Sequence, residues 1–251
     1  DLFAALHRHE VEYVLIGGLA VALHGVERNT KDIDISVVVS PKNMQQLVLT
    51  TQELDLKPML PVPLEQAQID TLKEWHAHRN LQAFSLHGGG PAGVSLDILL
   101  FPPIDPAAMC QRAIKLDVAG VPVVLATIDD LITLKQSAGR PIDLLDIEHL
   151  HRIDKPAQFH HDEPFSLVNT ANADIQQRWL SARDQRTYLV SDERLRAFGQ
   201  LSHLQRLQWV EQCSSFVRLA QAAKQAQGGF QLAIEYRMVS NDPIRFKRLW
   251  Q

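Results

Sequence analysis

The segment from residue 32 to residue 39 alternates acidic or polar side chains with apolar ones, in the order Asp-Ile-Asp-Ile-Ser-Val-Val-Val. In a β-strand, side chains two positions apart point to the same face of the sheet. A strand through this segment therefore places the carboxylates of Asp32 and Asp34 side by side. Two adjacent carboxylates are costly within a sheet unless something offsets their charge, so this pair restricts what the chain can build here.

A third acid, Asp97, lies in the middle of the apolar run from Val94 to Phe101, which predicts another strand. Mg²⁺ prefers oxygen ligands, and two such ions can hold the attacking and the leaving oxygens of a displacement at phosphorus. Asp32, Asp34 and Asp97 are therefore candidate catalytic residues and metal ligands, with two Mg²⁺ ions expected during catalysis. In the alternative interpretation the three acids mark strand ends and bind nothing.

A glycine pair, Gly17 and Gly18, follows a strand predicted over residues 11–16 and precedes a short helix predicted over residues 19–24. Exposed backbone N–H groups at the start of a helix, together with the positive end of the helix dipole, can hold a phosphate. The pair is a candidate phosphate contact. The alternative is an ordinary glycine turn.

A polar and basic run feeds directly into the acidic strand. Thirteen residues separate Gly18 from Asp32, and the last four of them are Arg28, Asn29, Thr30 and Lys31. Cations beside carboxylates suit a nucleotide, so Arg28, Thr30 and Lys31 are candidate nucleotide contacts. Arg28 and Lys31 could instead balance the acids as surface salt bridges.

Apolar periodicity and turn residues outline the rest of the N-terminal part. We expect a helix from Pro41, then a loop with one helix, then strands joined by glycine turns, and two helices after Thr127 as N-cap. Pro122 is expected to confine its strand to a sheet edge. The predicted ranges are strands 81–87, 94–101, 113–118 and 121–125 and helices 128–138 and 141–152.

The charge differs between the two parts of the chain. Residues 1–168 hold 13 Lys and Arg against 22 Asp and Glu, a net charge of -9, whereas residues 169–251 hold 12 against 7, a net charge of +5. Apolar residues recur at helical spacing in the second part. We therefore predict an N-terminal domain over 1–155, a linker over 156–168, and a smaller all-helical domain over 169–251.

Composition excludes several classes of protein. Hydrophobic residues make up 45% of the chain, as in ordinary globular proteins, and the apolar runs fall far short of the length that a membrane-spanning helix needs. Cys110 and Cys213 are too few for a disulfide framework. The first residues show no signal-peptide pattern. We expect a cytoplasmic protein without a membrane partner.

The combination of these motifs resembles a known signature. The run Gly17-Gly18, the acidic strand Asp32-Ile33-Asp34-Ile35 and the later strand from Ser95 to Leu100, with Asp97 in it, resemble the signature of the DNA polymerase β-like nucleotidyltransferase superfamily. A second segment, from Asp129 to Lys135 and from Ala138 to Ile147, is similar to that of AbiEii-like bacterial nucleotidyltransferase toxins and their uncharacterised relatives. Together these segments cover roughly residues 10–150.

The resemblance implies an α+β nucleotidyltransferase fold, in which a mixed β-sheet is flanked by helices. It places Gly17 and Gly18 near the triphosphate, Asp32 and Asp34 on Mg²⁺, and Asp97 as a third ligand or as the base that activates the acceptor.

The same resemblance gives roles to residues of the second segment. Lys135 would reach a nucleotide phosphate, and Asp143 or Asp146 would sit at the rim of the site. From the residues alone, Lys135 could instead be a solvated helix residue and the two acids could be first-turn helix residues. Ile142 stands where many relatives have a basic residue, so a contact at that position is left open.

The resemblance also implies a reaction, the Mg²⁺-dependent transfer of a nucleoside monophosphate from an NTP such as ATP to a hydroxyl group, with release of pyrophosphate. The acceptor stays open between an RNA such as tRNA, a protein side chain and a small molecule such as an aminoglycoside. The basic C-terminal part could attract RNA or dock on the acidic N-terminal part. A toxin role with a cognate antitoxin rests on family analogy alone. The alternative function is a non-catalytic nucleotide-binding or interaction module that retains the fold.

Overall fold

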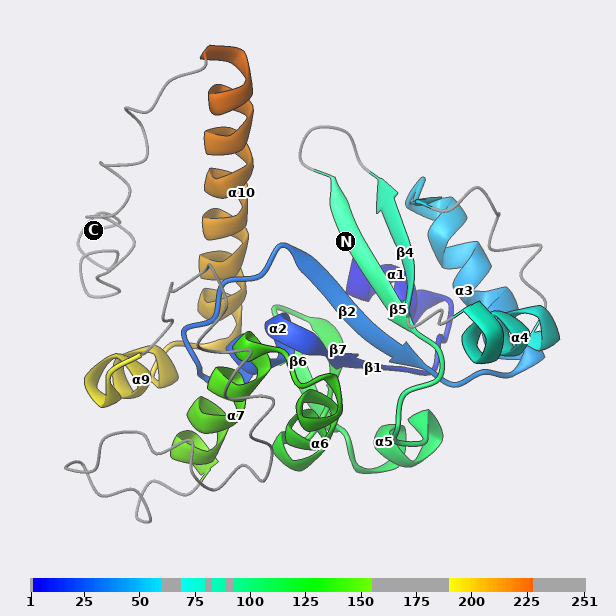
Figure 1. The fold of residues 1–251 in the computed structure, drawn as a ribbon, viewed down its shortest axis with the longest axis horizontal. Helices are drawn as coiled ribbons and strands as arrows, with labels where there is room; N and C mark the ends of the chain where they lie inside the picture. Colours follow the sequence, from blue (N-terminus) through cyan, green and yellow to red (C-terminus); the bar gives the residue numbers. More distant parts are fainter. Residues whose placement is uncertain (1, 60–68, 80–82, 89–92, 155–189, 228–251) are drawn as a thin grey trace.

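The computed structural model contains a mixed seven-stranded sheet with helices packed around it (Figure 1). The expected α+β class is confirmed. The structure describes residues 2–59, 69–79, 83–88, 93–154 and 190–227. In sheet order β3-β4-β5-β2-β1-β7-β6, the strands are β3 (Lys57–Pro58), β4 (Ala83–Gly88), β5 (Val94–Leu99), β2 (Asp32–Val37), β1 (Tyr13–Ile16), β7 (Val121–Leu125) and β6 (Ile114–Val118).

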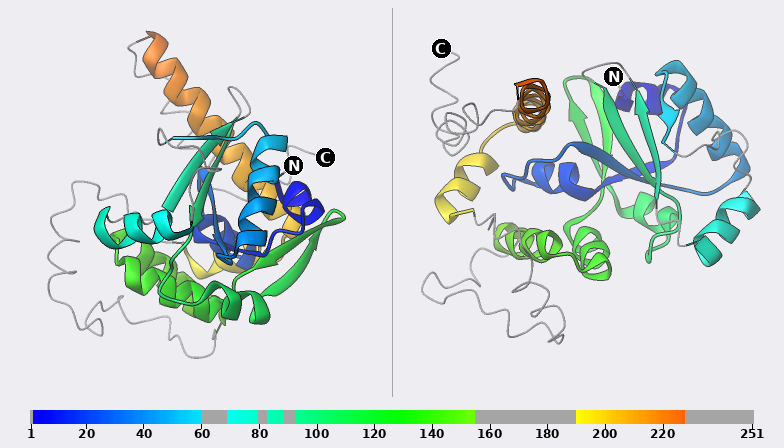
Figure 2. Two further views of the ribbon diagram at one scale, coloured as in Figure 1. Left: turned by 90° about the vertical axis from the view of Figure 1, so that its right-hand side faces the viewer. Right: turned by 45° about the horizontal axis from the view of Figure 1, so that its top comes forward.

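Helices surround the sheet, and the last described one stands apart from the others. In Figures 1 and 2, α10 rises beside α2 and extends beyond the rest of the described chain. None of the described helices is long and apolar enough to cross a membrane. The described helices are α1 (Leu2–Arg8), α2 (Gly17–His24), α3 (Pro41–Glu53), α4 (Ile69–Arg79), α5 (Pro106–Arg112), α6 (Ile128–Ala138), α7 (Pro141–Asp154), α9 (Asp192–Gly199) and α10 (His203–Gln227).

The central strands pair in both senses. β2 runs antiparallel to β1 and parallel to β5, and β5 runs antiparallel to β4. Because β2 and β5 are parallel and in register from Asp32 to Ser36, their first residues lie at the same end of the sheet. That end also receives α2, which begins directly after β1 at Gly17.

The two faces of the central strands differ in character. Ile35, Leu96, Ile98, Phe84 and Leu86 alternate with polar residues along β2, β5 and β4, and all five are fully buried. Burying one such side chain contributes about 1.5 to 3 kcal/mol. The alternation therefore fixes the register of the sheet, because a slip of one residue would bury the polar set.

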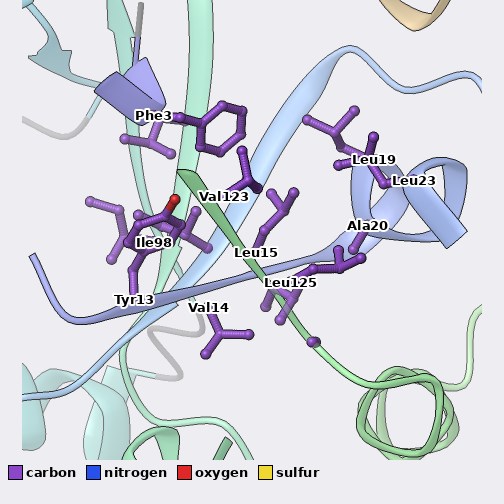
Figure 3. Packing of buried hydrophobic residues seen from close by; sticks show 14 of the residues in the cluster. Phe3, Tyr13, Val14, Leu15, Leu19, Ala20, Leu23, Ile98, Val123 and Leu125 are labelled. Carbon is purple, nitrogen blue, oxygen red and sulfur yellow. The ribbon is translucent and has the colours of Figure 1, made fainter. Parts of the chain in front are cut away.

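A second part of the core joins β1 and β7 to α2. Figure 3 shows Leu15 of β1 close to Leu125 of β7, on the side of the cluster where Leu19, Ala20 and Leu23 of α2 lie. α2 is buried almost all round, since Leu19, Ala20, Val21, Ala22 and Leu23 are all core residues. A helix buried on every side holds its N-terminus in a fixed position.

Several local predictions are confirmed. Thr127 caps α6 by accepting a hydrogen bond from the N–H of Asp130 at 3.2 Å, and Gly139 ends the helix with a φ of 62°. Ala119 and Gly120 form the two-residue hairpin turn between β6 and β7, both with positive φ. The short helices α1 and α5 and the two-residue β3 were not expected.

The prediction that Pro122 confines its strand to an edge is wrong. β7 lies between β1 and β6, and β6 is the edge strand. Proline is tolerated because β7 pairs with β1 only near its end, at Leu15 and Leu125, and Ala126 continues this contact with a bond from its N–H to the carbonyl of Leu15. Pro122 itself therefore needs no hydrogen bond toward β1.

The described C-terminal helices dock on the N-terminal part. The guanidinium of the buried Arg206 on α10 donates to the carbonyl oxygens of Leu23, at 2.6 Å, and Gly199. Arg194 on α9 forms an ion pair with the buried Glu27. The predicted linker, 156–168, lies outside the described residues, and the division into domains stays a prediction.

Candidate active site

Asp32, Asp34 and Asp97 come together on one face of the sheet. Asp34 lies directly opposite Asp97 across the parallel pair β2 and β5, and Asp32 precedes Asp34 by two residues on the same strand. Neighbouring strands lie about 4.8 Å apart, and residues in register point to the same face. The alternation in the sequence predicts the first pair, and the register of β5 adds the third acid.

The Asp34 carboxylate lies in an electrostatically unfavourable place. Burial, and then the charges of Asp97 and Asp32, raise the pKa of Asp34 to about 6. The positive charge of Lys135 and a hydrogen bond from the backbone N–H of Gly18 oppose this rise. The acidic cluster therefore carries more negative charge than its surroundings balance, and a bound cation or proton would relieve it.

The glycine pair is required by close contacts with the candidate site. A side-chain carbon on Gly17 would lie 2.0 Å from Asp34 Oδ2, and Gly17 has a φ of +69°. A side-chain carbon on Gly18 would lie 2.9 Å from Cβ of Thr30. The pair thus lets the first turn of α2 approach both the acidic strand and the segment that leads into it.

The polar run before β2 is held from several sides. Arg28 Nε lies 3.1 Å from Asp146 Oδ1, and the Thr30 hydroxyl donates to the carbonyl oxygen of Asp32 at 3.2 Å. Lys31 is exposed. Of the three candidate nucleotide contacts in this run, Arg28 and Thr30 are therefore engaged within the protein.

Lys135, Asp143 and Asp146 form a buried ionic network. Lys135 Nζ lies 3.2 Å from Asp143 Oδ1 and 2.6 Å from Asp146 Oδ2, and all three residues are buried. Arg140 Nε lies 2.7 Å from Asp143 Oδ2 and Arg28 pairs with Asp146. Lys135 is thus neither a solvated helix residue nor an isolated cation.

The electrostatics of Asp143 reflect this network. Burial raises the pKa of Asp143, but the hydrogen bond from Arg140 and the positive charges of Lys135 and Arg140 outweigh it, so the pKa lies below its ordinary value. The network thereby favours the ionised form of Asp143. Because Lys135 and Arg140 also act on the neighbouring cluster, the two groups of charges form one electrostatic unit.

The site face of the sheet carries further polar residues that are not among the predicted site residues. Ser85 on β4 lies opposite Asp97, and Ser95 on β5 lies opposite Asp32. His87 on β4 lies opposite Ser95 and is exposed. The alternation of polar and apolar residues along β4 was the available signal. The polar face thus continues from the acids toward β4.

The acids are not gathered around a single point. In the ranges described above, no group of three or more His, Cys, Asp or Glu side chains is arranged to hold a metal ion. The donor chemistry still suits Mg²⁺, since carboxylate oxygens are the ligands that this ion prefers. The negative charges of Asp97 and Asp32 around Asp34 also favour the binding of a cation.

Comparison with known proteins gives likenesses to solved structures alone. No family model matches the chain, and no curated protein matches it. Among solved structures, the chain is similar to ANT(2")-Ia, determined as a crystal structure in complex with adenylyl-2"-tobramycin. The identity is 18%, the match covers 63% of this chain and 86% of that chain, and the TM-score is 0.39. At this level of similarity the match assigns neither a family nor an activity.

Proposed function

We propose that this chain is a Mg²⁺-dependent nucleotidyltransferase that moves a nucleoside monophosphate from an NTP to a hydroxyl acceptor and releases pyrophosphate. The observation that carries the proposal is the juxtaposition of Asp34 with Asp97 across parallel strands, next to the glycine turn that begins α2. The chemistry needs a place for phosphate beside a place for a cation. The first turn of α2 and the carboxylates of β2 supply these two places.

The residues have separate roles in the proposed reaction. Asp32 and Asp34 would hold Mg²⁺, which neutralises charge on the phosphates and on the oxygens that attack and leave. The acceptor hydroxyl attacks the α-phosphorus, its proton passes to the Asp97 carboxylate, and the bond to pyrophosphate breaks. No covalent enzyme intermediate is needed, because positioning and charge neutralisation carry the reaction.

Sheet order supports an arrangement of the two substrates. α2 follows β1, the metal-binding acids lie on β2, and Asp97 lies one strand further on β5. An in-line displacement places the attacking and leaving oxygens on opposite sides of phosphorus. We therefore place the triphosphate toward α2 and the acceptor hydroxyl toward β5 and β4.

Metal and nucleotide are expected to bind together. Since the three acids do not surround one point, and since Mg²⁺ is usually held by one or two carboxylates with substrate phosphates, the nucleotide would complete the ligand set. Mg²⁺ alone should bind weakly and the Mg²⁺–NTP complex tightly. Equal affinity for NTP with and without Mg²⁺ would contradict this arrangement.

Calorimetric titration of the four NTPs, with and without Mg²⁺, tests the proposal. Metal-dependent binding should be seen in the wild-type chain and lost in Asp32→Ala/Asp34→Ala. The matched control is Asp55→Ala/Asp129→Ala, which removes two exposed acids that are not among the candidate site residues. Loss in both double variants, or binding that survives in the first, would remove the proposed mechanism.

An RNA such as tRNA, a protein hydroxyl and a small molecule all fit the reaction. Two arginines of the basic C-terminal part, Arg194 and Arg206, are engaged by the N-terminal part, which favours docking over RNA attraction for these two. A toxin role beside a cognate antitoxin, and a cytoplasmic location, stay predictions that rest on the AbiEii-like resemblance and on composition.

The second candidate is a non-catalytic nucleotide-binding or interaction module. A module of that kind needs no base at Asp97, so Asp97→Asn should leave both NTP affinity and biological effect unchanged. In the nucleotidyltransferase, the same variant should bind Mg²⁺–NTP and fail to turn it over once the acceptor is supplied. The two functions are therefore separable by this single substitution.

A further inference from the structure

Helix α10 is fastened to the N-terminal part at two points. Arg206 donates to the carbonyl oxygens of Leu23 and Gly199, and Ser214, eight residues later, donates to the carbonyl oxygen of Thr30. Eight residues of helix span about 12 Å. The helix therefore bridges from the end of α2 to the segment that leads into the acidic strand.

The second fastening point is buried and made by one small side chain. Ser214 is 5% exposed, and its oxygen also lies 3.4 Å from Asn29 Oδ1. Thr30 itself is half-buried, and its carbonyl would lose a stabilising hydrogen bond if the hydroxyl were removed. The hydroxyl thus restrains the backbone of Thr30 and contacts the side chain of Asn29.

Thr30 passes this restraint to the candidate active site. A Cβ atom on Gly18 would lie 2.9 Å from Cβ of Thr30, so Thr30 is pressed against the first turn of α2. The Thr30 hydroxyl also donates to the carbonyl oxygen of Asp32 at 3.2 Å. From the other side, Arg28 is held by Asp146 at 3.1 Å.

We propose that Ser214 is a positioning residue, which by holding Thr30 against Gly18 sets the place of Asp32 and so makes α10 part of the nucleotide site. The inference rests on the proposed function for its effect on nucleotide binding. Its geometric part, the restraint on residues 29–34, stands on the contacts alone. The C-terminal helices are then a component of the site and not an appended module.

Ser214→Ala is the test, and Ser191→Ala is its matched control. Ser191 caps α9 by accepting from the N–H of Arg194 at 3.3 Å, so the control deletes the same hydroxyl from the same part of the chain without touching Thr30. Two measurements are made on the full chain: calorimetric titration with the preferred NTP in Mg²⁺, and amide hydrogen exchange of residues 29–34.

Ser214→Ala should weaken Mg²⁺–NTP binding about three- to tenfold, the effect of one lost hydrogen bond, and speed exchange at residues 29–34 by a similar factor. Ser191→Ala should leave both quantities at the wild-type value. Wild-type exchange in Ser214→Ala overturns the inference, as does an equal loss of affinity in both variants. If the wild-type chain binds no NTP, the proposed function fails, and the exchange rates still decide whether Ser214 restrains the segment.

Discussion

Lys135 Nζ lies 2.6 Å from Asp146 Oδ2, in a contact that joins α6 to α7 beneath the acidic cluster. Asp143 accepts from the same ammonium at 3.2 Å. One buried cation therefore satisfies two buried carboxylates. This arrangement is costly to break, because removing Lys135 leaves two buried carboxylates with only the more exposed Arg140 and Arg28 beside them.

Lys135→Met should lower the free energy of unfolding by about 3 to 5 kcal/mol, the usual effect of breaking a buried ion pair from one side. Urea denaturation measures it. Lys115→Met, on the exposed face of β6, is the control and should change stability by less than about 0.5 kcal/mol. A Lys135 variant with wild-type stability but no NTP binding would instead give this lysine a purely phosphate-binding role.

Asp34→Asn should stabilise the metal-free chain at neutral pH. The carboxyl has a pKa of about 6 in the folded chain against 3.8 ordinarily, so ionisation above pH 6 destabilises the folded state. Removing the charge should return roughly 1 to 3 kcal/mol at pH 7.5 and almost nothing below pH 4. Denaturation at both pH values without metal tests this. A less stable variant at pH 7.5 would show that the cluster is already compensated.

Gly17→Ala should damage both stability and binding. The added carbon would lie 2.0 Å from Asp34 Oδ2, and the φ of +69° disfavours any side chain. Gly120→Ala is a matched control, since Gly120 has a φ of +82° and open space around it. The control isolates the backbone cost, about 1 to 2 kcal/mol. Gly17→Ala should lose more than this and bind Mg²⁺–NTP at least tenfold more weakly, and equal losses would argue against the close contact.

Lowering the pH should reduce the stability of the folded chain, because His149 resists protonation in the folded state. This residue is fully buried, accepts from the N–H of Val190 at 3.2 Å, and has a pKa that burial and then Arg152 lower from 6.5 to about 4. Between pH 6.5 and pH 4 the unfolded chain takes up a proton that the folded chain does not, so stability falls as pH falls.

The decrease in the free energy of unfolding caused by His149 should reach up to about 3 kcal/mol at pH 4 and vanish above pH 6.5. His149→Gln keeps an acceptor for Val190 but cannot take up the proton, so its stability should decline less over the same range. Chemical denaturation at pH 7, 5.5 and 4.5 compares the two chains. Parallel declines would place the acid sensitivity elsewhere.

Local patterns predicted much of the N-terminal part. The alternation from Asp32 to Val37 predicted a strand with both acids on one face, and Thr127 with Gly139 predicted both ends of α6. These features depend on neighbours in sequence, whereas the pairing partners of a strand do not. The expectation that Pro122 marks an edge strand was wrong because β7 lies between β1 and β6. Proline is tolerated there since β7 pairs with β1 only at its far end.

The connections that complete the candidate site were not predictable. Lys135 and Asp146 lie on the consecutive helices α6 and α7, only 11 positions apart. Arg28 contacts the same acid from 118 positions away. Nothing near Ser214 in the sequence indicates that its hydroxyl meets Thr30. Such contacts follow from how whole helices pack, which a pattern of nearby residues does not specify.

The contact between Ser214 and Thr30 joins residues 184 positions apart. During synthesis, at roughly 5 to 20 residues per second, the strand that carries the acids precedes the helix that braces it by on the order of ten to forty seconds. In a chain still attached to the ribosome, the acids of β2 would be present before Ser214 can contact Thr30. The timing of translation would then separate the appearance of the sheet from the onset of nucleotide binding.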